Sequence, residues 1–208
     1  MKAGVVPGEV SHACTLGAGT LMAMLRCLAV LHGCPPSVSF RMHRSHARVE
    51  SAAIRLRHVT PADLPLLYEI QLDQQSNDMA GTKARSREAC VAAWEWRLVN
   101  PEINARVIEM VSETGPTIAG SISRFPAEGH YAVGYWIARW HWGKGIASQG
   151  LSLFLVEERR RPLHATAATG NAASRRILEK CGFRCVGVRM GEETERFLAR
   201  EIADYVLG

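Results

Sequence analysis

The 208-residue sequence lacks an uninterrupted apolar run of the roughly eighteen residues that a membrane span requires. Its most apolar stretch, residues 16–31, is interrupted by Arg26, and Lys2 is the only basic residue ahead of it. This stretch has no clear small-x-small cleavage site, so it matches a signal peptide poorly. We therefore expect a cytoplasmic protein that has no membrane partner.

The six cysteines include no CxxC pair, and no histidine stands at zinc-ligand spacing from Cys181 and Cys185. Disulfide frameworks and zinc sites usually show such spacings. The cysteines are therefore interpreted as buried thiols in a reducing compartment, and no metal is expected.

A strong charge of either sign is also missing from most of the chain. The formal net charge is +5, but residues 1–50 contain five basic and two acidic residues. The remainder has twenty basic and eighteen acidic residues, so it is nearly neutral. A basic patch is therefore indicated only weakly, and we expect no nucleic-acid partner.

Residues 1–50 are left unassigned, as an N-terminal extension with the composition of a disordered segment. A targeting segment and a translation start at Met42 remain alternatives. The 47% hydrophobic content indicates a globular chain, and we expect one domain over residues 54–207.

Alternation, turn residues and helical spacing predict the elements of this domain. The expected strands are residues 54–59, 104–113, 117–125, 130–138, 162–168, 183–190 and 202–207. A first helix is expected to begin at Thr60-Pro61, and three more are expected over residues 87–99, 146–158 and 172–181. A polar connection at 74–86 separates the first helix from the second. Leu64, Leu67, Tyr68 and Leu72 would form the apolar face of the first helix, and Ala89, Ala93, Trp96 and Leu98 that of the second. The sum is a mixed α/β layer fold: a meander, one βαβ unit and a closing strand pair.

The stretch WHWGKGIASQGL, residues 140–151, follows the expected strand 130–138 and opens a helix. A glycine-rich turn at a helix N-terminus leaves backbone N–H groups free for phosphate oxygens. The Walker pattern is absent, and Ser148 stands where a dinucleotide fingerprint needs glycine. A strand–helix connection that binds nothing is the alternative.

Two motifs resemble the GCN5-related N-acetyltransferase (GNAT) superfamily. Gly145 and Ala147 match the pyrophosphate-loop pattern [Q/R]-x-x-G-x-[G/A], with Trp142 in the first position. The block NAASRRILEKCGF, residues 171–183, is similar to N-x-x-S-x-x-x-x-x-K-x-G-F of the ribosomal-protein alanine N-acetyltransferase (RimJ/RimL-like) branch. The resemblance covers residues 54–207.

The resemblance implies the GNAT fold, a central twisted mixed sheet flanked by helices, and acetyl-CoA as co-substrate without a metal. It implies transfer of an acetyl group to a primary amine, on a protein N-terminus or a small molecule, by a monomer or homodimer. The implied coenzyme-binding residues are Trp136, Ile137, Ala138, Trp142, Gly143, Lys144, Gly145, Ile146, Ala147, Ser148 and Asn171. Lys144 could equally point at solvent, Trp142 could pack on the helix, and Asn171 could act only as a helix cap.

The resemblance also implies two catalytic residues. Ser174 would protonate the departing thiolate, and Glu193 would accept the ammonium proton. Many relatives place a tyrosine where this chain has Leu178. The alternatives are an exposed serine, a solvated acidic loop and, for the whole chain, a non-catalytic acyl-CoA-binding module.

Overall fold

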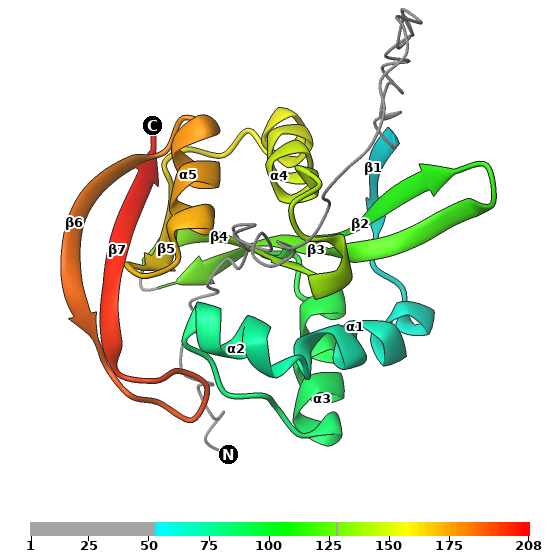
Figure 1. The fold of residues 1–208 in the computed structure, drawn as a ribbon, viewed down its shortest axis with the longest axis horizontal. Coiled ribbons are helices and arrows are strands. Elements are labelled where there is room, and N and C mark those ends of the chain that lie inside the picture. Colours follow the sequence, from blue (N-terminus) through cyan, green and yellow to red (C-terminus); the bar gives the residue numbers. More distant parts are fainter. Residues whose placement is uncertain (1–52, 128) are drawn as a thin grey trace, which may run out of the picture. The chain divides into compact units, whose positions relative to one another are not determined.

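The structure is a computed structural model that describes residues 53–127 and 129–208 (Figure 1). The predictions for residues 1–50 lie outside the described residues. The seven strands are β1 (Ala53–His58), β2 (Asn104–Ser112), β3 (Gly115–Ala127), β4 (His130–Ile137), β5 (Leu163–Ala168), β6 (Arg184–Gly191) and β7 (Arg200–Leu207). The helices are α1 (Leu64–Gln71), α2 (Gln74–Ala80), α3 (Arg87–Val99), α4 (Ile146–Glu157) and α5 (Ala172–Lys180), with 3₁₀ turns η1 (Pro61–Asp63) and η2 (Arg139–His141).

The strands form one mixed sheet in the order β1-β2-β3-β4-β5-β7-β6. All neighbouring pairs are antiparallel except β4 and β5, which run parallel because α4 crosses between them. The predicted meander, βαβ unit and closing strand pair are therefore confirmed. The last strand, β7, inserts between β5 and the edge strand β6.

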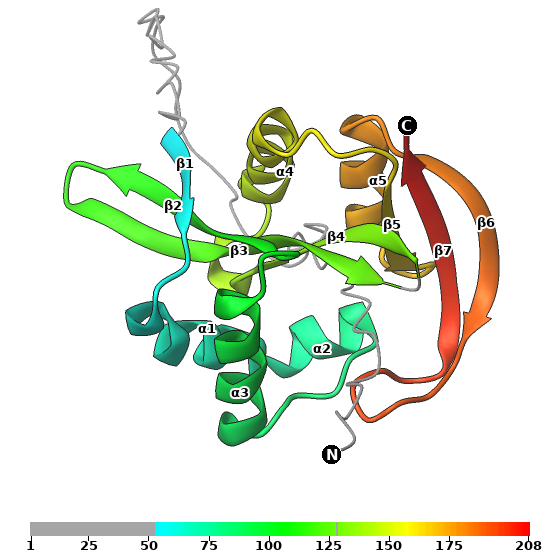
Figure 2. The ribbon, with the colours of Figure 1, turned by 180° about the vertical axis from the view of Figure 1, so that it is seen from behind.

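Helices cover both faces of the sheet (Figures 1 and 2). One core cluster lies between the sheet and helices α4 and α5, and it includes Leu151, Phe154 and Leu178. A second cluster lies under α1 and α3, and it includes Leu67 and Trp94. Burial on both faces explains why the central strand β4 is apolar along nearly its whole length.

Strands β4 and β5 pair at only two positions, Tyr131 with Leu163 and Ala132 with His164. Beyond these positions β5 continues its pairing with β7, whereas β4 continues its pairing with β3. The C-terminal half of β4 therefore borders a gap in the sheet. We call this opening the β4–β5 gap.

The first predicted helix begins as the 3₁₀ turn η1, and Leu72, expected on its apolar face, is 42% exposed. The connection predicted at 74–86 contains helix α2, whose N-terminus is capped by the Asp73 carboxylate accepting the Ser76 N–H at 2.9 Å. The buried face of α2 includes Ser76 and Asn77, and the Asn77 side chain donates to Gln71 O at 2.7 Å. Hydrophobic periodicity cannot detect a helix whose buried face is polar.

The predicted apolar face of α3 is wrong although its limits, 87–99, are right. Trp96 is 50% exposed and Leu98 is also exposed, whereas Cys90 and Trp94 are buried. Cys90, Trp94 and Arg97 follow the i, i+4, i+7 spacing and therefore lie on one face of the helix. This face, with Cys90, Trp94 and Arg97, turns toward the sheet and lines a pocket.

We propose that residues 54–207 fold without residues 1–50. A chain starting at Ser51 keeps all of β1 and both core clusters. We expect its free energy of unfolding to change by less than roughly 0.5 kcal/mol, as for changes away from a core. Urea unfolding of the two chains measures this difference. Loss of the cooperative transition in the shorter chain would assign residues 1–50 to the core.

Candidate active site

The loop between β4 and α4 has the geometry of an anion-binding turn. Gly143 and Gly145 adopt φ values of 73° and 74°, a region that glycine enters without steric cost. Gly145 is the N-cap of α4 and offers no side-chain cap. The backbone N–H groups of residues 143–148 make no hydrogen bond to another described residue. A Cβ at Gly143 would meet nothing within 4 Å, so the space in front of the loop is open.

The side chains of the loop differ in their surroundings. Lys144 is exposed, whereas Ile146 and Ala147 are buried and present only their backbone N–H groups. The Trp142 indole donates its N–H to Ile137 O at 2.9 Å and packs against the core under α4. The Trp142 ring therefore holds the loop against β4. Such packing on the protein was the alternative to a contact between Trp142 and the coenzyme.

The backbone of β4 presents alternate residues to the β4–β5 gap. Ala138 donates its N–H to Ala119 O at 2.8 Å, and its carbonyl accepts the His141 N–H at 2.9 Å. Strand alternation therefore directs the N–H groups of Ala138 and Trp136 toward β3, and those of Tyr135 and Ile137 toward the gap. Trp136, Ile137 and Ala138 were expected to contact the coenzyme through their backbone. Of these three residues, only Ile137 has an N–H that faces the gap.

Asn171 and Ser174 are both fully buried at the first turn of α5. The Asn171 side-chain oxygen accepts the Ser174 N–H at 3.0 Å, so Asn171 caps α5, and its contact with the coenzyme stays a prediction. The exposed-serine alternative is wrong, because the Ser174 hydroxyl lies 3.2 Å from the Tyr135 hydroxyl. Leu178 is buried in the core. The tyrosine beside Ser174 is therefore Tyr135 of β4, whereas many relatives have a tyrosine on α5 at the position of Leu178.

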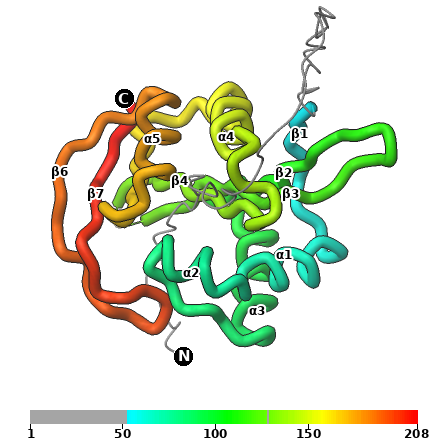
Figure 3. Tube along the Cα trace, viewed as in Figure 1, coloured from blue at the N-terminus to red at the C-terminus, as the bar shows by residue number. Residues whose placement is uncertain are grey.

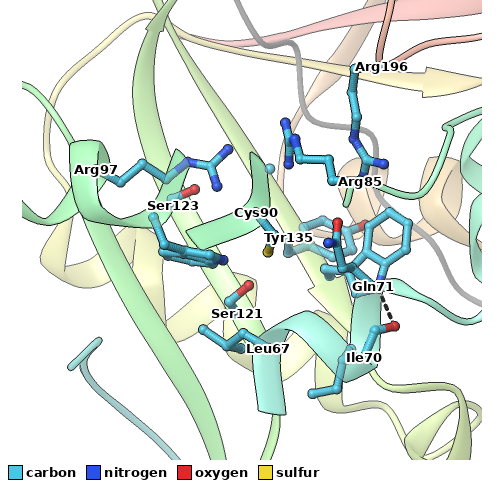
Figure 4. Close-up of a pocket in the computed structure, with 13 residues that line it drawn as sticks. Leu67, Ile70, Gln71, Arg85, Cys90, Arg97, Ser121, Ser123, Tyr135 and Arg196 are labelled. Atoms are coloured by element: carbon cyan, nitrogen blue, oxygen red, sulfur yellow. Dashed lines mark hydrogen bonds between the residues drawn. The ribbon is translucent and has the colours of Figure 1, made fainter. Parts of the chain in front are cut away.

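A pocket opens on the other side of Tyr135, between α1, α3, β3, β4 and the loop between β6 and β7 (Figure 4). Its lining residues are Leu67, Ile70, Gln71, Arg85, Cys90, Trp94, Arg97, Ser121, Ser123, Gly134, Tyr135, Trp136 and Arg196. Gly134, Tyr135 and Trp136 belong to the half of β4 that borders the β4–β5 gap, so the pocket lies next to this part of the strand. We call it the acceptor pocket. Sequence patterns could not reveal it, because its residues come from five separate elements.

The loop between β6 and β7 closes one side of the acceptor pocket by docking on the segment after α2 (Figure 3). Leu198 donates its N–H to Gly81 O at 2.9 Å, and Lys83 donates its N–H to Arg196 O at 2.8 Å. Thr82 and Phe197 form an isolated β-bridge. These backbone bonds place Arg196 at the pocket.

Glu193 is in the same loop, but it does not line the acceptor pocket. Its carboxylate is exposed and lies 2.7 Å from Lys83 Nζ, which also donates to Thr194 O. The hydrogen bond from Lys83 lowers the pKa of Glu193, which makes the carboxylate a weaker base. The structure therefore does not bring Glu193 to Ser174.

Cys90 is buried, Cys181 is half-buried and Cys185 is exposed on the edge strand β6, so buried thiols were correctly expected only at Cys90. Within residues 53–127 and 129–208, no group of three or more His, Cys, Asp or Glu side chains is arranged to hold a metal ion. No helix in the described ranges has the length and apolarity needed to cross a membrane.

Comparison with known proteins gives a consistent result. A family model for an acetyltransferase (GNAT) domain matches residues 53–184. Spermidine N-acetyltransferase from Vibrio cholerae, solved with CoA and spermine, is similar in fold, with a TM-score of 0.64 and 15% identity over 74% of this chain and 94% of that one. No curated protein sequence matches the chain significantly.

Two further solved structures share the fold. The microcin C7 self-immunity acetyltransferase MccE, solved with acetyl-CoA and AMP, has a TM-score of 0.60 and 19% identity over 74% of this chain and 91% of that one. RimJ from Mycobacterium smegmatis, solved with CoA-disulfide, has a TM-score of 0.58 and 20% identity over 76% of this chain and 82% of that one.

Proposed function

Because the chain belongs to the acetyltransferase (GNAT) family, we propose that it transfers an acetyl group from acetyl-CoA to a primary amine. The observation that carries the proposal is the alignment of three features around β4. The open turn at residues 143–148 lies at one end, the β4–β5 gap runs beside the strand, and the buried Tyr135–Ser174 hydroxyl pair joins β4 to α5. The similar folds of proteins solved with CoA or acetyl-CoA support the same ligand.

The turn at residues 143–148 would bind the pyrophosphate of the coenzyme. Its unpaired N–H groups and the positive end of the α4 dipole both favour an anion. The exposed Lys144 would add a mobile positive charge beside it. Asn171, whose side chain caps α5, would contribute indirectly by fixing that helix beside the gap.

The pantetheine arm would lie along the β4–β5 gap, where β4 lacks a strand partner. The Ile137 N–H would donate to the thioester carbonyl and to the oxyanion that forms when the amine attacks. A backbone donor fixed in a sheet suits this role, because it needs no reorganisation as charge develops. Trp142, bonded to the Ile137 carbonyl, would keep this part of the strand in place.

Cleavage of the carbon–sulfur bond leaves a thiolate that needs a proton. We propose that the Tyr135 hydroxyl supplies it, because Tyr135 lies on the part of β4 that borders the gap, where the thiolate would form. Phenols are also stronger acids than aliphatic alcohols. Ser174 would then position the Tyr135 hydroxyl through their 3.2 Å hydrogen bond. A non-catalytic acyl-CoA-binding module would have no need of this pair.

The proton that the acceptor ammonium loses before its neutral amine attacks would pass to water, since Glu193 lies outside the acceptor pocket and is paired with Lys83. Glu193→Gln should therefore change kcat/KM by less than about fivefold, against the roughly 10²–10⁴-fold loss that follows removal of a general base. Glu192→Gln, at the exposed neighbouring position, is the matched control. Steady-state kinetics that show a hundredfold loss at Glu193 alone would restore it as the base.

The loop sequence around Trp142 favours the RimJ/RimL-like branch, and a cytoplasmic location would supply the acetyl-CoA. Branch membership does not determine the acceptor, because α1, α3 and the loop between β6 and β7 form its pocket. Release of free thiol from acetyl-CoA in the presence of a panel of amines tests the proposed function. Acetyl-CoA binding without thiol release from any amine would favour the non-catalytic module.

A further inference from the structure

Three arginines from separate elements converge on the acceptor pocket (Figure 4). Arg85 precedes α3, Arg97 is in the last turn of α3, and Arg196 is in the loop between β6 and β7. Arg97 Cζ lies 5.0 Å from the centre of the Trp94 ring, and Arg196 Cζ lies 5.8 Å from that of Trp136. Both guanidinium groups are therefore held against aromatic walls of the pocket.

The three guanidinium groups are close enough to repel one another. Loss of solvation lowers the pKa of Arg97 to about 10. The pKa of Arg85 is also lowered to about 10, first by loss of solvation and then by the charges of Arg196 and Arg97. The pKa of Arg196 is lowered to about 10 as well, first by loss of solvation and then by the charge of Arg97. All three remain cationic at neutral pH, so a bound anion would relieve both effects.

The rest of the lining suits the same ligand. Among the residues that the structure describes, those that line the pocket include no Asp or Glu, and Glu195 is the acidic residue whose charge raises the pKa of Arg85. Gln71 is 7% exposed, and its Nε2 has no hydrogen-bond partner among the described residues although it lines the pocket. A buried amide donor without a partner is costly unless a ligand supplies an acceptor oxygen. The Ser121 and Ser123 hydroxyls offer two further donors.

We propose that the acceptor pocket binds a carboxylate or phosphate group of the acceptor, so that the substrate is a small amine that carries an oxyanion. This inference rests on the proposed acetyl transfer. Planar guanidinium groups recognise carboxylate and phosphate oxygens through paired hydrogen bonds. Gly134, Tyr135 and Trp136 of β4 line the same pocket, so the anion would be bound beside the strand along which the thioester is proposed to lie.

The same charges have two consequences for the reaction. They repel cationic acceptors such as polyamines, which distinguishes this pocket from one built for spermine. They also favour the neutral form of a nearby amine over its ammonium form, because like charges destabilise each other. A neutral amine is the nucleophile that the reaction needs, so the arginines would assist the chemistry without a carboxylate base.

A small acceptor fits the enclosure better than a peptide. Helices α1 and α3, strands β3 and β4 and the docked loop between β6 and β7 all contribute walls. The backbone bonds at Gly81 and Lys83 fix that loop against the segment after α2. A peptide acceptor would need a channel past these walls.

The test compares matched amines that differ in one anionic group: phenylalanine with phenethylamine, and O-phosphoethanolamine with ethanolamine. Thiol release from acetyl-CoA gives kcat/KM for each, and the two pairs separate carboxylate from phosphate recognition. We expect at least a tenfold preference for one anionic member over its partner. Arg97→Gln and Arg196→Gln should each remove roughly tenfold of that preference, the scale of one charge-assisted interaction.

Arg87→Gln is the matched control. Arg87 is an exposed arginine at the start of α3 that lies over the Tyr68 ring and does not line the pocket. Its replacement removes the same charge from the same helix, so the preference should persist. Thermal unfolding confirms that each variant is folded, and the loop position of Arg196 provides a second variant if Arg97→Gln fails.

Equal or better transfer to phenethylamine, ethanolamine or spermidine would overturn the inference while leaving the acetyltransferase activity in place. So would better transfer to a peptide with an acidic N-terminus. Failure with every amine would instead contradict the proposed function. In that case tryptophan fluorescence decides on the pocket: saturable quenching by O-phosphoethanolamine or phenylalanine that Arg97→Gln abolishes supports anion binding, and its absence with both ligands overturns it.

Discussion

Tyr135→Phe is expected to lower kcat by roughly 10²–10⁴, the usual contribution of one general acid, and to leave the Kd for acetyl-CoA unchanged. The variant removes only the buried hydroxyl that lies 3.2 Å from Ser174 Oγ. The ring stays in the core under α4 and α5, so binding and folding should be preserved. Steady-state kinetics together with calorimetric titration of acetyl-CoA separate the two effects.

The proton-transfer assignment has two internal checks. Ser174→Ala should have a smaller effect, about tenfold, and should add little to Tyr135→Phe, because groups that act as one unit are not additive. Tyr131→Phe is the matched control: it makes the same change on β4, where the hydroxyl donates to the Glu102 carboxylate. A Tyr135→Phe enzyme as active as Tyr131→Phe would assign the proton to another donor.

Gly145→Val is expected to weaken acetyl-CoA binding by roughly 10- to 100-fold, or about 1.4–2.8 kcal/mol. Valine strongly disfavours the φ of 74° that Gly145 adopts as the N-cap of α4. The turn would therefore relax, and its N–H groups would no longer converge on the pyrophosphate. Calorimetry with acetyl-CoA and with CoA measures the loss, which should be equal for the two ligands because both carry the pyrophosphate.

Gly129→Val controls for backbone strain alone. Gly129 has a similar φ of 83° in the turn before β4, and a Cβ there would meet nothing within 4 Å. The control should lose stability but keep its affinity for acetyl-CoA. If Gly145→Val is folded and binds acetyl-CoA as tightly as Gly129→Val, the turn at residues 143–148 does not bind the pyrophosphate.

Local features of the site could be predicted from the sequence. The glycine turn, the strand before it and the Asn171 cap each depend on neighbouring residues, so the pattern at residues 140–151 and 171–183 was sufficient. The element order followed for the same reason. Residue types at fixed spacing determine such features, whatever the rest of the chain does.

Features that depend on register and contact could not be predicted. The YAVGYWIA run did not show which residues of β4 face the gap, because this follows from the Ala138 N–H bond to Ala119 on β3. Tyr135 was missed because its hydroxyl meets Ser174 only through the packing of α5 on β4, between residues 39 positions apart in the sequence. Arg97 was missed because the apolar face of α3 was expected at Trp96 rather than at Cys90 and Trp94. Arg196 reaches the pocket only through the docked loop.

Acetyl transfer with Tyr135 as the proton donor is tested most directly by incubating the full chain and its Tyr135→Phe variant with acetyl-CoA and a single accepted amine. Free thiol and acetylated amine are quantified together, the amine by mass spectrometry. We expect equal amounts of thiol and acetylated amine from the wild type, and at least a hundredfold slower formation of both by the variant at unchanged acetyl-CoA affinity. Formation at the same rate by the two proteins, or thiol release without an acetylated amine, would contradict this expectation.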